Sequence, residues 1–158
     1  MTIGAMAMVN CRTVMGDDAL DEDLLLRLCR AVFAEFDASY LAARLPLIVK
    51  PVLTLADDDD GQPIGFKLAY EREPGTLYSW LGGVVPSARR RGVASKLMAT
   101  QHDWARAAGY MRVETRTRAG NNAMIIINLR HGFQIVGLEA VAGTEPVVIQ
   151  KLNFGSTF

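Results

Sequence analysis

Apolar side chains first recur at helical spacing near the start of the chain. Positions 24, 25, 28, 32 and 36 are leucine, valine or phenylalanine and share one helical face, which predicts a helix over residues 21–36. Asp18 or Asp21 carries the kind of side chain that caps such a helix. A second, shorter helix is predicted over residues 38–44, and Pro46 ends it.

The next part of the chain follows a period of two. Residues 52–56 form a short apolar run, and residues 64–71 alternate between apolar and polar or small side chains, as a half-buried strand does. The acidic run 57–60 between them, followed by glycine, is typical of an exposed hairpin turn. A further apolar run over residues 77–85 follows the turn at residues 73–76. These three strands are predicted to form an antiparallel meander.

The period then returns to that of a helix. Apolar and neutral side chains at 93, 97, 101, 104 and 108 mark one helical face, and Gly109 stands where such a helix stops. Residues 111–117 alternate as a strand, so strand, helix and strand form a βαβ unit whose two strands are parallel. Asn121 or Asn122 caps another helix that runs to His131 and stops at Gly132.

The order of the predicted elements indicates the fold class. Residues 133–139 and 146–154 are predicted to close the chain as a hairpin of two strands. Helices, meander, βαβ unit, helix and hairpin together predict an α/β fold with a mixed sheet of six or seven strands and about four helices on its faces. The 158 residues have the size of one domain, so residues 1–158 are predicted to be a single domain.

Composition narrows the classes of function. Seventeen Lys and Arg balance seventeen Asp and Glu, a zero net charge that argues against a nucleic-acid partner. No apolar run reaches the roughly 18–20 residues that span a bilayer, and Met1 to Asn10 do not resemble a secretory signal. Cys11 and Cys29 are too few for a disulfide framework, and no spacing is typical of a metal site. We therefore expect a cytoplasmic protein with free thiols, no metal and no membrane partner.

The zero net charge conceals two halves of opposite sign. Residues 1–60 hold five basic and eleven acidic side chains, whereas residues 61–158 hold twelve basic and six acidic ones. An excess of one sign can attract a ligand of the other sign. The basic half is suited to an anionic ligand, and the acidic half to a cationic one.

One segment of the basic half has the composition of a phosphate site. Residues 84–95 join a predicted strand to the start of a predicted helix, where free backbone N–H groups and the helix dipole favour an anion. Gly92 and Ala94 are small enough to let an anion approach the backbone, and Arg89, Arg90 and Arg91 add positive charge. On the arginine run alone, a solvated basic turn is the simpler interpretation.

Two motifs resemble those of the GNAT superfamily of N-acetyltransferases. Val84-x-Pro86-x-x-Arg89-x-x-Gly92-x-Ala94 resembles the acyl-CoA signature of that family, which lies between a strand and a helix. Asn121, followed by Gly132-Phe133 at the family's spacing, resembles its fourth helix and the entry into the next strand. The element order is also similar over nearly the whole chain, least closely before residue 21.

The resemblance implies which residues bind acetyl-CoA as co-substrate. Backbone groups of residues 82–85 would pair with the pantetheine arm as if it were another strand, and the paired glycines Gly82 and Gly83 suit a bulge or a close backbone approach. N–H groups of residues 91–95 would hold the pyrophosphate, with Arg89 or Arg90 beside it. The cofactor-binding residues so implied are Gly83, Val84, Val85, Arg89, Arg90, Arg91, Gly92, Val93, Ala94, Ser95, Asn121 and Asn128.

The catalytic residues are less clearly marked. Many members of the family carry a tyrosine seven residues after the motif asparagine, where it protonates the departing thiolate, and here that position is Asn128. An amide is no acid, although it could hydrogen-bond the sulfur or the pantetheine. Glu114 and Tyr78 are the catalytic candidates that we retain for proton transfer.

Other side chains are also candidates for proton transfer. The remaining candidates for a base are Glu71, Glu73 and His131. For each glutamate, including Glu114, a solvated surface ion pair is the simpler interpretation, and for Tyr78 it is packing in the sheet. His102 faces away from the apolar stripe of its helix and is expected to be exposed, and the two tryptophans are expected in the core.

The sequence therefore predicts an acetyl-CoA-dependent N-acetyltransferase that moves the acetyl group directly to a primary amine. The alternative is a catalytically inactive module that binds or senses acyl-CoA. The acceptor is left open between a small molecule and a peptide, and the acidic first half suggests a cationic one. A homodimer paired through the final strand is a further possibility.

Overall fold

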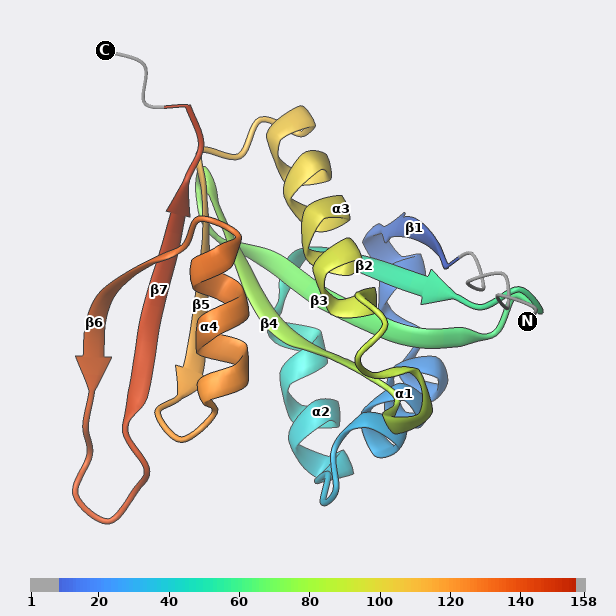
Figure 1. Ribbon diagram of the computed structural model, residues 1–158, viewed down its shortest axis with the longest axis horizontal. Coiled ribbons are helices and arrows are strands. Elements are labelled where there is room, and N and C mark those ends of the chain that lie inside the picture. The colour runs from blue at the N-terminus through green and yellow to red at the C-terminus, as the bar shows by residue number, and fades with distance from the viewer. Residues whose placement is uncertain (1–8, 156–158) are drawn as a thin grey trace, which may run out of the picture.

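The computed structural model describes residues 9–155 and contains one mixed sheet of seven strands (Figure 1). The strand order is β1-β2-β3-β4-β5-β7-β6, and all neighbours are antiparallel except β4 and β5, which are parallel. The strands are β1 (Asn10–Met15), β2 (Val49–Asp57), β3 (Pro63–Glu73), β4 (Thr76–Val84), β5 (Arg112–Arg118), β6 (Gln134–Glu139) and β7 (Val147–Asn153). The α/β fold and the mixed sheet expected from the sequence are confirmed.

Four α-helices lie on the two faces of this sheet (Figure 1). They are α1 (Glu22–Val32), α2 (Ala38–Arg44), α3 (Val93–Ala107) and α4 (Asn122–Arg130), with short 3-10 turns η1 (Gly16–Leu20), η2 (Leu45–Leu47) and η3 (Pro86–Ala88). Helices α1 and α2 cover one face, and α3 and α4 cover the other. No helix within residues 9–155 is long and apolar enough to cross a membrane.

Each face of the sheet has its own hydrophobic core. On the α1 face, Leu25 and Leu28 pack against Phe66 and Leu68 of β3, and all four are almost completely buried. On the α3 face, Met98 and Ala105 pack with side chains of β2 to β5. Burial of two apolar layers against one sheet supplies most of the favourable free energy of such a fold.

Two elements differ from the sequence predictions. Strand β1, which no residue range predicted, pairs along β2 and forms one edge of the sheet. Its burial is partial and irregular, so its sequence has no clean alternation. Helix α1 ends at Val32 rather than at Phe36, because Phe33 has an extended backbone and stacks on Phe36 outside the helix.

The final hairpin inserts into the sheet rather than ending it. Strand β7 pairs with β5 on one side and with β6 on the other. Both of its edges are occupied, so the prediction that the final strand could pair across a homodimer is wrong. Within residues 9–155 the free edges of the sheet are those of β1 and β6.

The sheet opens between its two parallel strands. Strand β4 pairs with β5 only from Thr76 to Ser79, whereas it follows β3 as far as Val84. The register of β3 and β4 shifts at Trp80, which places a bulge where the two parallel strands separate. Figure 1 shows β4 and β5 diverging below this point, with α4 in front of the gap.

Candidate active site

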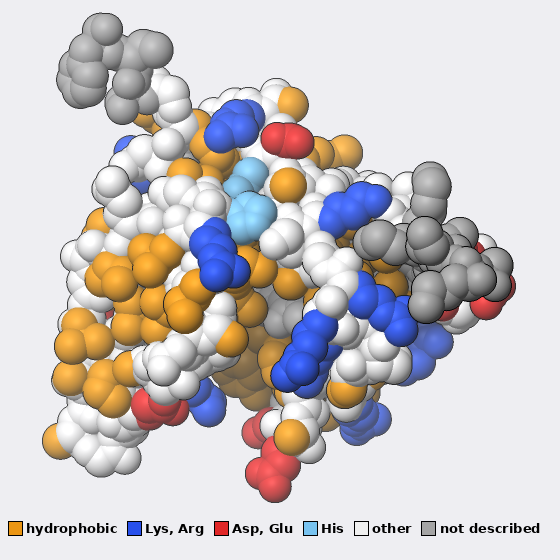
Figure 2. All heavy atoms as spheres, viewed as in Figure 1, with side chains coloured by type: hydrophobic (Ala, Val, Ile, Leu, Met, Phe, Trp, Pro, Cys, Tyr) orange, Lys and Arg blue, Asp and Glu red, His pale blue; other side chains and the backbone are white. Residues whose placement is uncertain are grey.

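A cleft occupies the opening between β4 and β5. It has a volume of about 580 Å³ and is lined by the end of α1, the last residues of β4, the start of α3 and one side of α4. Beyond Ser79 the edge of β4 that faces away from β3 has no strand partner, so its N–H and C=O groups are free for an extended ligand. Figure 2 shows the hollow between α3 and α4, with apolar side chains in it and Lys and Arg side chains beside it.

The N-terminus of α3 forms one end of this cleft. Gly92 is the N-cap in the left-handed region, with φ of 75°, and contributes no capping side chain. The N–H groups of the first helical turn, Val93 to Ser95, therefore lack partners inside the helix, and the helix dipole adds positive charge there. Gly92, Val93, Ala94 and Ser95 all line the cleft, which suits a phosphate group.

The three arginines before this helix do different things. Arg89 donates from Nε to the backbone carbonyl of Val84 and from its terminal nitrogen to that of Val32, both at 2.9 Å. Its guanidinium thus joins β4 to the end of α1. Arg90 lines the cleft with φ of 64°, and Arg91 is exposed beside it. Val85 does not line the cleft, because its N–H donates to the carbonyl of Ile64 and its carbonyl accepts from the N–H of Ala88.

Gly83 allows α1 to approach β4 closely. A Cβ atom at this position would lie 2.1 Å from Cγ1 of Val32, which is closer than two non-bonded carbon atoms can come. A bulge and a close backbone approach are both expected of the glycine pair, and Gly83 shows the close approach. The wall of the cleft is therefore formed by backbone.

The two asparagines of α4 lie in different environments. Asn121 lines the cleft and caps α4, where its Oδ1 accepts from the N–H of Met124. Asn128 is only 2% exposed, and its amide donates to Gln150 of β7 at 2.9 Å. The side chain of Asn128 is therefore committed to the packing of α4 on β7 and does not line the cleft.

Tyr78 and Glu114 are neighbours on the opposite face of the sheet from α3. The two residues are paired across the parallel strands, one residue before the strands separate. Glu114 is 7% exposed, so its interpretation as a solvated surface ion pair is wrong. Three cations surround its carboxylate: Arg72 at 3.3 Å, and Arg116 and Lys151 at 3.8 Å.

Tyr78 lies under the guanidinium of Arg72, which is 5.0 Å from the ring centroid. Burial raises the pKa of its hydroxyl, although Arg116 and Arg72 oppose this effect. The hydroxyl consequently keeps its proton at neutral pH and can donate it, but it does not act as a phenolate base.

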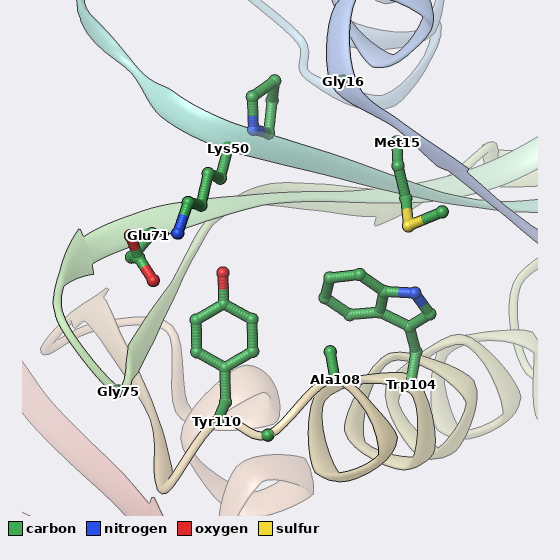
Figure 3. Close-up of a pocket in the computed structure, with 10 residues that line it drawn as sticks. Met15, Gly16, Lys50, Glu71, Gly75, Trp104, Ala108 and Tyr110 are labelled. Carbon is green, nitrogen blue, oxygen red and sulfur yellow. Dashed lines mark ion pairs between the residues drawn. The ribbon is translucent and has the colours of Figure 1, made fainter.

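None of the candidate acids and bases lines the cleft, Tyr78 and Glu114 included. Glu71 pairs with Lys50 at 3.3 Å and lines a second hollow at the far end of α3, together with Trp104 and Tyr110 (Figure 3). Figure 3 shows the Tyr110 hydroxyl directed toward this ion pair. Glu73 is exposed beside Thr76. Neither carboxylate lines the cleft.

The expectation that His102 is exposed is wrong. Its ring is 5% exposed and packs against Phe133, Phe154 and His131. Burial lowers its pKa to about 3, and the positive charges of Lys67, His131 and Arg106 act in the same direction. His102 is therefore a neutral member of the core.

Sequence reasoning missed several side chains around Tyr78 and Glu114. Arg72 and Tyr70 of β3 and Lys151 of β7 reach the same patch as Glu114. The alternation in residues 64–71 indicates which side chains share a face of β3. It does not indicate that β7 lies beside β5. The contacts of Glu114 with Arg72, Arg116 and Lys151 could therefore not be predicted from the sequence.

Comparison with known proteins identifies the family of this site. The model of the acetyltransferase (GNAT) family matches residues 22–133, which include the cleft and both motifs. The chain belongs to this family. No curated protein sequence is similar enough to match it.

Solved structures share the fold at low sequence identity. The ribosomal-protein-S18-alanine N-acetyltransferase of Escherichia coli is 15% identical, with a TM-score of 0.75 over 96% of this chain and 97% of that one. The IAA acetyltransferase of Bacillus cereus is 16% identical, with a TM-score of 0.71 over 93% and 100%.

A third structure contains the co-substrate. It is a Bacillus anthracis protein classed with the streptothricin acetyltransferases, in complex with acetyl coenzyme A. It is 22% identical, with a TM-score of 0.61, and the alignment covers 66% of this chain and 63% of that one.

Proposed function

We propose that this protein is an acetyl-CoA-dependent N-acetyltransferase in which residues 1–158 act as one domain. It transfers the acetyl group directly to a primary amine. The observation that carries the proposal is the continuous path from the free edge of β4 to the uncapped N-terminus of α3. An extended arm fits the strand edge and a pyrophosphate fits the helix end, which are the two halves of coenzyme A.

Backbone atoms do most of the binding in this proposal. Gly82, Gly83 and Val84 offer the strand edge, and the N–H groups of residues 91–95 receive the pyrophosphate. Arg90 and Arg91 supply charge beside it, and Arg89 holds the wall by joining β4 to α1. Asn121 lies opposite β4 on the other side of the cleft.

The chemistry requires one bond to form and one to break. The neutral amine attacks the thioester carbonyl, and a backbone N–H of the free β4 edge just beyond Ser79 stabilises the oxyanion. The C–S bond then breaks, and the amine proton leaves as the amide forms. Tyr78 donates a proton to the departing thiolate, and the amine releases its proton to solvent.

Release of free thiol tests the activity. Purified protein and acetyl-CoA should release thiol in the presence of an accepted primary amine, within a panel of polyamines, amino acids, aminoglycosides and peptides. The double variant Arg89→Ala with Arg91→Ala should lose most of the thermal stabilisation that acetyl-CoA confers. Arg130→Ala, an exposed arginine on α4, is the matched control and should keep it.

Two results would contradict the proposal in different ways. Stabilisation by acetyl-CoA without thiol release on any amine would favour the inactive acyl-CoA-binding module. Absence of any stabilisation by acetyl-CoA would exclude both the enzyme and the binding module.

A further inference from the structure

The face of the sheet next to Tyr78 carries an unusual set of charges. We define the basic face by six side chains: Tyr70 and Arg72 of β3, Tyr78 of β4, Glu114 and Arg116 of β5, and Lys151 of β7. It lies where β4 and β5 separate, on the side of the sheet opposite α3. If coenzyme A occupies the cleft as proposed above, its acetyl end points to this place.

Charge on the basic face is not balanced. Glu114 faces Arg72, Arg116 and Lys151, and a second carboxylate, Glu139, pairs with Arg116 at 3.2 Å. Three cations against two carboxylates leave one positive charge. Arg44 of α2 adds another beyond the aromatic side chains, 5.8 Å from the ring of Trp80.

The positive groups are accessible and the central carboxylate is not. Side chains of Arg72, Arg116 and Lys151 are 38%, 29% and 37% exposed, whereas that of Glu114 is 9% exposed. A ligand that arrives on this face therefore meets guanidinium and ammonium groups first. Such groups bind a carboxylate by charge-assisted hydrogen bonds, which arginine can make in pairs.

One donor on the basic face has no partner. The Nε of Arg116 is buried and donates no hydrogen bond within residues 9–155, since its distance of 3.8 Å to Glu114 is too long for one. A buried donor without an acceptor is costly, and a ligand oxygen could reach this Nε only if the Arg116 side chain shifts.

Nine of the eleven acidic residues of the first half lie elsewhere, and the other two, Glu35 and Asp37, are exposed between α1 and α2, just after the cleft residues Val32 and Phe33. Asp57 to Asp60 form the turn after β2, at the end of the sheet where Val85 bonds Ile64. Asp17 to Asp23 lie at η1 and at the start of α1, about 16 Å along the helix from Val32 at the cleft. Within residues 9–155, none of the carboxylates of the first half forms an ion pair with a cation of the basic face.

We infer that the acceptor is an amine that also carries a carboxylate, of the amino acid class, and that Arg72 and Arg116 are its specificity-determining residues. The aromatic side chains Tyr70, Tyr78 and Trp80, whose rings contact one another, provide an apolar surface beside the two arginines. This inference rests on the proposed function and names its substrate class.

Matched pairs of amines test the inference. Phenylalanine is compared with phenylalanine amide and phenethylamine, and tyrosine with tyramine, by thiol release with acetyl-CoA. The carboxylate member should have the higher kcat/KM, by about 10- to 100-fold, the usual worth of hydrogen bonds to a charged group. Arg72→Gln and Arg116→Gln should abolish the preference through KM, and Arg130→Gln is the matched control.

Variants that leave Glu114 without its partners could fail to fold, so a second change is included. Arg72→Lys keeps the charge but loses the paired hydrogen bonds of a guanidinium, and it should keep only part of the preference. A merely structural role would lower the rates with both members of a pair and leave their ratio unchanged. Binding of N-acetylphenylalanine and N-acetylphenethylamine to the complex with CoA, measured by calorimetry, gives a readout that needs no turnover.

The outcomes separate the two proposals. Turnover with equal rates for both members of each pair overturns the amino acid acceptor and leaves the acetyltransferase standing. Preferred binding of the carboxylate compound without turnover of any amine supports the anion site and contradicts the enzyme. Equal binding of both compounds, with no turnover, overturns both.

Discussion

A single hydrogen atom at Gly83 decides how closely α1 approaches the cleft. Any side chain here would overlap Val32, so the Gly83→Ala variant must move the helix or the strand. We expect it to lower the free energy of unfolding by about 1–3 kcal/mol, the usual cost of overpacking. It should also weaken acetyl-CoA binding, and chemical denaturation and calorimetry measure the two effects.

Two further variants check this explanation. Gly137→Ala of β6, where the new Cβ would meet Ile149 at an ordinary 3.5 Å, should change stability much less. Combining Gly83→Ala with Val32→Ala should restore most of the lost stability. If the double variant were as unstable as Gly83→Ala, contact with Val32 would not be the cause.

Tyr78 provides a residue-scale test of the proton donor. Its hydroxyl makes no hydrogen bond in the described part of the chain, and its raised pKa keeps it protonated. Tyr78→Phe should therefore leave the melting temperature nearly unchanged, while kcat falls by about 100-fold or more, as loss of a general acid does. The thiol-release assay and a thermal melt measure both. An unchanged kcat would remove Tyr78 from the mechanism.

At the scale of elements, His102 of α3 stays neutral where this helix packs against residues that follow α4 and β7. Burial lowers the pKa of His102 to about 3, while an unfolded histidine titrates near 6.5. Below pH 6.5 the unfolded chain therefore binds a proton that the folded chain does not. This difference stabilises the unfolded state progressively as the pH falls toward 3.

We expect the free energy of unfolding to fall between pH 6.5 and pH 4.5 by at most about 1.4 kcal/mol per pH unit from this group. His102→Phe removes the titrating group and keeps a ring against Phe133, so it should flatten the curve. Denaturant titrations at each pH provide the comparison. The same slope in both proteins would show that other groups cause it.

At the scale of the whole molecule, the sequence pattern predicted most elements and their order. A buried face of a helix or strand produces a regular spacing of apolar residues along the sequence. The edge strand β1 was missed since the run from Asn10 to Met15 is only partly buried and alternates poorly. The phosphate-binding N-terminus of α3 is formed by residues that are contiguous in sequence, so it could be predicted from residues 84–95. The basic face could not, because Arg72, Glu114 and Lys151 meet only through the registers of four strands.

Insertion of β7 between β5 and β6 has a consequence for the order in which the protein is made. The ribosome makes β7 after every other strand of this sheet, yet this strand joins the βαβ half of the sheet to its outer edge. Until residues 147–153 have left the exit tunnel, β5 has an open edge, β6 has no strand to pair with, and Glu114 lacks Lys151. The nascent chain can form the meander and the N-terminus of α3 early, but the basic face is completed only after β7 has emerged. An incomplete chain therefore exposes the edge of β5. An exposed strand edge can pair with another chain and so promote aggregation, or it can be bound by chaperones.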